Sequence, residues 1–94
     1  MRKIERLMNA AIDKKVFFEL NNTAVYYNEQ TNKSLVRLHD NLIAVIDHSD
    51  GMKVKVNESM FSDWPTSTTA GRLRALGVAA SIKGGMAAID GVVL

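Results

Sequence analysis

The stretch of sequence that decides the fold runs from residue 34 to residue 57, SLVRLHDNLIAVIDHSDGMKVKVN. It predicts three antiparallel strands that are joined by two tight turns. Asp40-Asn41 suits a type I′ turn because both residues tolerate positive φ, and Asp50-Gly51 is a stronger signal for the same turn. Two-residue turns fix the register of the strands that they join, so each turn predicts which side chains lie opposite one another.

The two predicted registers agree on which side chains share a face of the sheet. Six apolar side chains fall on one face, which we expect to belong to the core: Val36, Leu38, Ile43, Val45, Val54 and Val56. The other face is basic along the outer strands and apolar along the centre: Arg37, His39, Ala44, Ile46, Lys53 and Lys55. The run LIAVI, residues 42–46, is apolar on both faces, which is typical of a middle strand or of one that is covered on both sides.

Residues 2–15 are predicted to form a helix that covers the apolar face of this sheet. Its apolar side chains recur at the spacing of one helix face: Ile4, Leu7, Met8, Ala11 and Ile12. An amphipathic basic helix could instead lie on a membrane surface. Acidic residues are interspersed on its polar side and the sheet needs a cover, so we expect the helix to pack on the sheet.

The segment between this helix and the central strands supplies a further strand at residues 23–28, TAVYYN. A tight turn at residues 30–31 would pair Val25 with Val36. That pairing places Val25 in the core and Tyr26 on the opposite face, beside Arg37. Residues 16–20 form either a short edge strand or an extended link that buries one phenylalanine.

The chain after Asn57 predicts a second helix and a last hairpin. Large side chains at Met60, Phe61 and Trp64 are expected to anchor a turn to the core. The helix is predicted over residues 69–76, with its N-cap among residues 67–69. Gly84-Gly85 predicts a hairpin in the tail, residues 78–94, which either completes the sheet or exposes an apolar edge suited to a partner or a second copy.

Together these elements predict one domain, residues 1–94, of the α+β class. We expect an antiparallel meander of about four to six strands, covered on one face by the N-terminal amphipathic helix. The second short helix, near residues 69–76, is expected to pack at the end or edge of the sheet.

The composition sets limits on function. The chain has 94 residues and no cysteine, so a disulfide scaffold and a cysteine-based metal site are excluded. Its net charge of +2 permits contact with nucleic acid but is too small to indicate it. Charges interrupt every apolar run near the N-terminus, so we expect neither a signal peptide nor a membrane span.

No motif in the sequence predicts an active site, a metal site or a cofactor. The two histidines, His39 and His48, lie in turns without a placed nucleophile. The stretch DHSDG, residues 47–51, has two aspartates and a glycine but lacks the ligand spacing of a calcium loop. The stretch TSTTAGR, residues 66–72, could hold a phosphate at a helix N-terminus, although capping of the helix is the commoner role of such hydroxyls. We therefore expect a protein that is not an enzyme, with no catalytic residue, no metal and no cofactor.

One constellation of candidate binding residues follows from the predicted register. A sheet face with positive charge and an aromatic ring can bind single-stranded nucleic acid, or a partner protein. The candidate residues are Tyr26, Arg37, His39, Lys53 and Lys55, with Arg72 and Arg74 from the second helix. An ordinary solvated sheet face is the simpler interpretation, because three charges and one ring make a small platform.

Four segments of the chain, in this order, resemble a group of small accessory proteins of tailed bacteriophages. The segments are KIERLMNAAI, NNTAVYY, VRLHDNLIAVI and DWPTSTTAGRLRALG, which together span about the first four-fifths of the chain. The family-like hairpin has Gly-Asn where this chain has Asp40-Asn41, and the tail after Gly77 departs from the pattern. The resemblance implies a phage origin and a place in the cytoplasm of the bacterial host, and it brings no catalytic motif.

The functional hypotheses follow from this combination. The first is a phage protein that binds and modulates, for example inhibits, a host protein such as a defence or transcription component. The second is a nucleic-acid-binding module that uses the basic sheet face. The third is a structural homo-oligomer that assembles through the tail, Val78–Leu94. None of the three involves a membrane.

Overall fold

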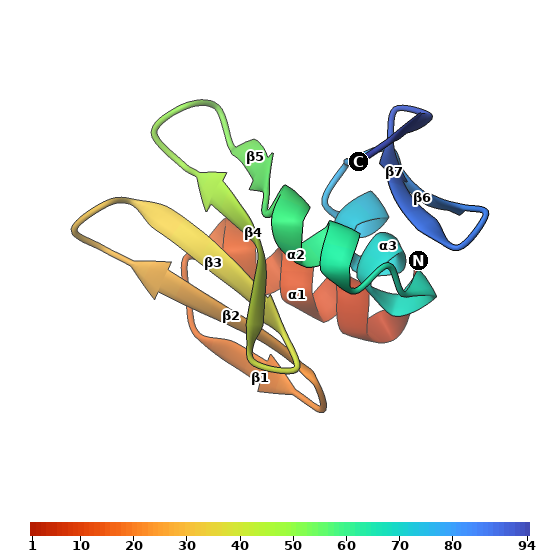
Figure 1. Cartoon of the computed structure of the whole chain (residues 1–94). Coiled ribbons are helices and arrows are strands. Elements are labelled where there is room, and N and C mark those ends of the chain that lie inside the picture. Colours follow the sequence, from red (N-terminus) through yellow and green to blue (C-terminus); the bar gives the residue numbers. More distant parts are fainter.

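The computed structural model describes residues 1–94 and confirms the α+β class (Figure 1). Three helices and eight strands follow one another in the order α1, β1–β5, α2, α3, β6–β8. Strands β1 to β5 form one antiparallel sheet in sequence order, and β6 to β8 form a second, small sheet. Helices α2 and α3 lie between the two sheets, and α1 packs behind the larger one (Figure 1). The helices are α1 (Lys3–Lys14), α2 (Glu58–Asp63) and α3 (Ser67–Ala75).

Helix α1 covers one face of the five-stranded sheet, as predicted. Met8, Ala11 and Ile12 are buried and join the same core cluster as Val25 and Val36 of the sheet. The burial of this stripe is the main force that holds the helix, because the apolar surface of a helix face must be removed from water. Lys15 ends the helix in the left-handed conformation, with φ of 57°.

The hairpin of β2 and β3 has the predicted pairing. Strands β1 (Phe18–Leu20), β2 (Thr23–Asn28) and β3 (Lys33–Leu38) run antiparallel, and Val25 lies opposite Val36. The first of these is the short edge strand that was one of two alternatives for residues 16–20. Val25 and Val36 are fully buried, so the register predicted for this hairpin is confirmed.

The turn between β3 and β4 (Asn41–Asp47) lies one residue earlier than predicted. His39 and Asp40, not Asp40 and Asn41, carry the positive φ values of 51° and 65° that a type I′ turn requires. Leu38 therefore lies opposite Asn41, and a β-bulge follows, because Val36 lies opposite Ala44 and Arg37 opposite Leu42. The bulge places both Ile43 and Ala44 in the core.

The connection between β4 and β5 (Lys53–Val56) also differs from the prediction. Residues 48–52 form a five-residue turn instead of a two-residue turn at Asp50-Gly51, and Ile46 lies opposite Val54. The side chains of β3 and β5 keep their predicted faces. After the bulge, the side chains of β4 lie on the face opposite to the predicted one. Ala44 and Ile46 are buried and Val45 lies on the opposite face, so the predicted positions of these three side chains were wrong.

Helices α2 and α3 contribute Phe61, Ala70 and Leu73 to the same core cluster that α1 covers. Helix α2 was expected only as an anchored turn; Phe61 is buried, whereas Trp64 is 62% exposed. Helix α3 begins two residues earlier than predicted, because the hydroxyl of Thr66 accepts a hydrogen bond from the Thr69 N–H at 3.1 Å and caps it. None of the three helices is long and apolar enough to cross a membrane.

The tail forms a separate sheet rather than completing the first one. Strands β6 (Ala80–Lys83) and β7 (Met86–Ile89) form the hairpin predicted from Gly84-Gly85, with Ile82 opposite Ala87. Strand β8 (Val92–Val93) adds a short third strand. This sheet packs on α3 and α2 and leaves Met86 and Val92 more than half exposed.

Substitution of Gly71 by alanine is expected to raise the free energy of unfolding by about 0.5–1 kcal/mol, because glycine costs backbone entropy inside a helix. Gly71 lies in the middle of α3, and a Cβ there would meet only ordinary contacts, the nearest being Glu5 Oε2 at 3.5 Å. Urea unfolding followed by circular dichroism measures the change. A loss of stability would show that Glu5 cannot accommodate the added methyl group.

Candidate functional site

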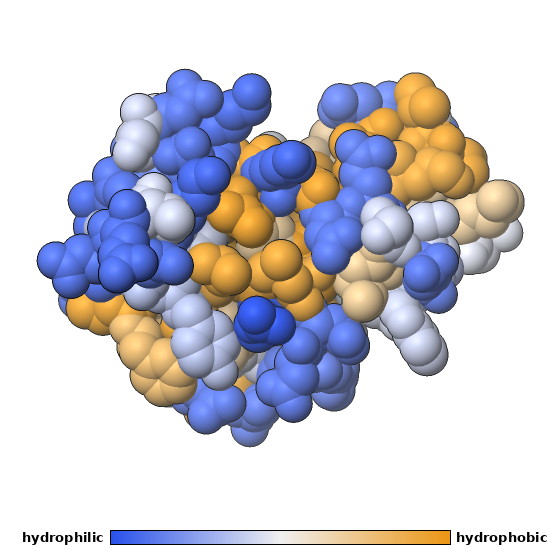
Figure 2. Space-filling model, turned by 60° about the vertical axis from the view of Figure 1, so that its left-hand side comes forward, coloured by the Kyte–Doolittle hydropathy of each residue, from blue (hydrophilic) through white to orange (hydrophobic).

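The face of the five-stranded sheet that points away from α1 carries an uncovered apolar band, which we call the open face. Cross-strand partners lie on the same face of a sheet, and Tyr26, Leu35, Val45 and Lys55 are successive partners across β2 to β5. Leu42 of β4 lies beside this row. None of these five side chains belongs to the core cluster, although Leu35, Leu42 and Val45 are half-buried. On the side drawn in Figure 2, hydrophobic residues gather in the centre and again on the upper right-hand lobe, and hydrophilic residues cover most of the left-hand and lower parts.

One end of the open face is aromatic. The rings of Phe17 and Tyr26 lie 5.2 Å apart at an angle of 59°, and Phe17 is 60% exposed. The guanidinium of Arg37 lies 5.8 Å from the centre of the Tyr26 ring, a cation–π contact. The predicted position of Tyr26 beside Arg37 is therefore confirmed.

The rim of the open face carries basic side chains. Lys33 and Lys53 both lie opposite Asp47, and Lys55 lies opposite Val45. Lys53 and Lys55 are exposed, and none of these lysines forms an ion pair within the chain. Their charges are therefore not paired with a carboxylate of the chain.

His39 does not belong to this rim. It lies in the turn between β3 and β4, at the opposite end of the hairpin from Lys53, and its ring nitrogen lies 3.3 Å from the Asn22 amide. The other histidine, His48, lies 2.7 Å from the Ser34 hydroxyl and edge-on to Tyr27. No group of three or more His, Asp or Glu side chains is placed to hold a metal ion.

The two arginines of α3 lie on another side of the molecule. Arg72 is buried, with 5% of its side chain exposed, and its Nη1 lies 3.0 Å from Glu5 Oε2. Its Nε donates a hydrogen bond to the Thr23 hydroxyl at 3.1 Å. Arg72 therefore joins α3 to α1 and β2, and its prediction as part of one surface with the sheet was wrong. Arg74 is exposed and donates to the carbonyl of Ala80.

The sequence-based set thus falls into three places, and only Tyr26, Arg37, Lys53 and Lys55 lie together. Leu35 and Phe17 were missed, and Leu42 was expected on this face but not among the binding residues. Phe17 could have been found, because it directly precedes Phe18, the first residue of the edge strand, and the neighbour of a core-facing residue in extended chain points to the opposite face. Leu35 could have been found from its position between Ser34 and Val36 in the confirmed register.

Comparison with known proteins places the chain in a phage family. No curated protein and no solved structure matches it. The family described as Kyanoviridae Gp96 protein matches residues 1–91. The match includes most of the tail after Gly77, the part of the chain that departs from the resemblance drawn from the sequence. The chain belongs to the Kyanoviridae Gp96 protein family, and it is a small phage protein.

Proposed function

We propose that this phage protein is a binding protein without enzymatic activity, and that it modulates a protein of the bacterial host by docking on it with the open face. The observation that carries the proposal is the uncovered apolar band from Tyr26 to Val45. Half-buried aliphatic side chains outside the core are unfavourable in water, and a partner that covers them would recover their burial.

The arrangement of residue types on the open face resembles a protein interface. Such interfaces combine an apolar centre, aromatic and arginine side chains that carry most of the binding energy, and a charged rim. Here Leu35 and Val45 form the centre, Tyr26 and Arg37 are the candidate anchors, and Lys55 lies on the rim. Unpaired rim lysines favour a partner whose own rim is acidic, because complementary charges speed association and reject wrong partners.

Nucleic-acid binding is the second candidate, and the pairing of two exposed rings with Arg37 supports it. Bases stack on aromatic rings, and Phe17 and Tyr26 supply two. The aliphatic centre favours a protein partner instead, because leucine and valine offer no flat surface for stacking. Nucleic-acid binding would weaken steeply with added salt, whereas docking through the apolar band would weaken much less.

Cross-linking from defined positions tests the docking surface. A photoreactive amino acid at position 26 or 55 is expected to capture one host protein from nuclease-treated bacterial lysate. The same group at Lys14, which is exposed on α1, serves as the control. Capture of the same proteins from all three positions would contradict a role of the open face.

Binding of the purified host protein then measures the contribution of each anchor. Tyr26→Ala and Arg37→Ala are each expected to weaken the complex at least about tenfold, because interface anchors contribute more than about 1.4 kcal/mol. Lys14→Ala should leave the affinity unchanged, and circular dichroism verifies the fold of each variant. Unchanged affinity in both open-face variants would overturn the proposal. Elution of the full-length protein as an oligomer in size-exclusion chromatography would favour self-association through the exposed tail instead.

A further inference from the structure

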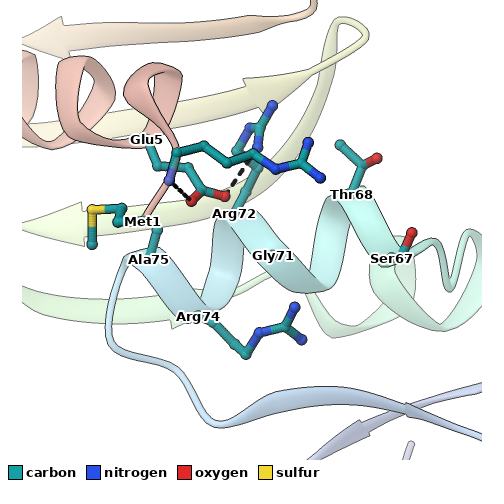
Figure 3. A pocket seen from close by; sticks show the side chains of 9 residues that line it. Met1, Glu5, Ser67, Thr68, Gly71, Arg72, Arg74 and Ala75 are labelled. Carbon is teal, nitrogen blue, oxygen red and sulfur yellow. Dashed lines mark hydrogen bonds and ion pairs between the residues drawn. The ribbon is translucent and has the colours of Figure 1, made fainter.

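A cleft of about 650 Å³ lies between the start of α1 and one side of α3, away from the open face (Figure 3). It is lined mostly by polar side chains. Three of them are arginines, Arg2, Arg72 and Arg74, and two are the hydroxyl-bearing Ser67 and Thr68 of the first turn of α3. Glu5 is the one carboxylate in the lining. The cleft therefore combines residues 1–5 with residues 67–75.

The charge of the cleft is not balanced within the chain. Glu5 uses Oε1 to accept a hydrogen bond from the backbone N–H of Arg2 at 3.0 Å, and Oε2 to pair with Arg72 at 3.0 Å (Figure 3). The Arg72–Glu5 pair is the one ion pair in the chain. The guanidinium groups of Arg2 and Arg74 consequently have no carboxylate partner, and the cleft keeps a surplus of two positive charges.

Arg72 presents a fixed donor at the base of this cleft. Its Nε and Nη1 are held by Thr23 and Glu5, and its Nη2 makes no hydrogen bond. No fully buried side-chain nitrogen or oxygen in the chain lacks a partner, so Nη2 keeps some contact with solvent, and Arg72 is among the residues that line the cleft. A guanidinium that is already immobilised loses little conformational entropy when it binds a ligand.

Arg74 lines the cleft from the exposed side of α3, opposite the buried Arg72 (Figure 3). Its Nη1 donates to the Ala80 carbonyl at 3.0 Å, and its Nη2 lies 3.8 Å from the position that a Cβ on Gly71 would occupy. The missing side chain at Gly71 keeps the floor between Arg74 and Glu5 open. The first turn of α3 adds unpaired N–H groups and the positive end of the helix dipole.

We propose that this cleft binds a phosphate group, most favourably the dianionic terminal phosphate of a monoester. Three guanidinium groups match the several acceptor oxygens of a phosphate better than the two of a carboxylate. Arg2, Arg74 and Nη2 of Arg72 supply the charge-assisted donors, and the hydroxyls of Ser67 and Thr68 supply neutral ones. The inference is independent of the proposed function, because no residue of the open face lines the cleft.

Titration of the full chain with inorganic phosphate and with adenosine monophosphate, at constant ionic strength, tests this site. Amide resonances of Ser67, Thr68 and Gly71 are expected to shift and saturate in nuclear magnetic resonance spectra. Arg74→Gln and Arg2→Gln should each weaken binding at least about tenfold, since each removes a charge-assisted hydrogen bond. Arg74→Lys should recover part of the loss by restoring the charge, and Arg72 is left unchanged because the fold depends on it.

The controls separate a built site from general attraction of anions. Lys55→Gln removes the same charge from the exposed rim of the open face and should leave phosphate binding unchanged. Adenosine, which lacks the phosphate, should not bind. Equal binding of phosphate and adenosine monophosphate assigns the site to the phosphate group, and tighter binding of the nucleotide assigns it to a nucleotide. Unsaturable shifts, binding of adenosine, or an equal loss in Lys55→Gln would overturn the proposal.

Discussion

Arg72→Ala is expected to lower the free energy of unfolding by about 3–5 kcal/mol, because it leaves the Glu5 carboxylate buried without its partner. A domain of this size has a total stability of about 5–10 kcal/mol. The variant should therefore be only marginally folded at room temperature. Urea unfolding followed by circular dichroism measures the loss, and the melting temperature should fall by more than about 10 °C.

The size of this effect follows from the position of the guanidinium. Glu5 is 7% exposed and Arg72 is 4% exposed, and the pair joins residues that are 67 positions apart in the sequence. The Nε of Arg72 also satisfies the hydroxyl of Thr23, which is fully buried in β2. Loss of Arg72 thus leaves one charged and one neutral polar group buried with fewer partners, and it loosens the packing of α1 on α3.

Arg74→Ala is the matched control, because it removes the same side chain two positions away on the exposed side of α3. It should cost less than about 1 kcal/mol. The double variant Glu5→Gln with Arg72→Met should be more stable than Arg72→Ala alone, since it removes both charges together. If Arg72→Ala and Arg74→Ala cost the same, the buried pair does not contribute as argued.

This ion pair marks one limit of prediction from the sequence. Glu5 and Arg72 each fall among polar residues of an amphipathic helix, and helical spacing alone places both toward solvent. Their burial arises only because the polar borders of α1 and α3 meet over β2. Nothing in the local pattern of either helix indicates that contact.

The middle strand marks a second limit. The predicted turns gave two registers that agreed with each other, but both depended on the run LIAVI. Beyond the bulge, both registers are shifted by one residue in the structure. The two shifts cancel for the outer strands, so Val36 and Val54 kept their predicted face. A strand that is apolar on both faces cannot oppose such a slip, because either face can enter the core.

Prediction succeeded where one face of an element was clearly polar. The pairing of Val25 with Val36 and the hairpin at Gly84-Gly85 are present. The predicted stripe of α1 is present at Met8, Ala11 and Ile12, but Leu7 was placed wrongly, because it is 38% exposed. The aromatic end of the open face could be predicted from the register of β2 and β3, which placed Tyr26 beside Arg37. The position of Val45 in its aliphatic centre could not be predicted, because it depends on the true register of β4.

Phe61→Ala is expected to cost about 3–5 kcal/mol, the range for removal of a buried phenylalanine ring. Phe61 is the largest fully buried side chain in the protein, at 1% exposure. Its short helix α2 packs against β4 of the larger sheet and β7 of the smaller one. The cavity left by the ring would therefore weaken the packing of both sheets, beyond the loss of apolar burial.

Trp64→Ala provides the comparison, because it removes an even larger ring just three residues later. Trp64 is 62% exposed, so its loss should cost less than about 1 kcal/mol. Phe61→Leu should fall between the two, since leucine fills part of the cavity. Urea unfolding of the three variants ranks them directly. If Trp64→Ala destabilised the protein as much as Phe61→Ala, the exposed tryptophan would have to be packed in solution, for example against a second copy of the chain. If Phe61→Ala were mild, α2 would not hold the two sheets together.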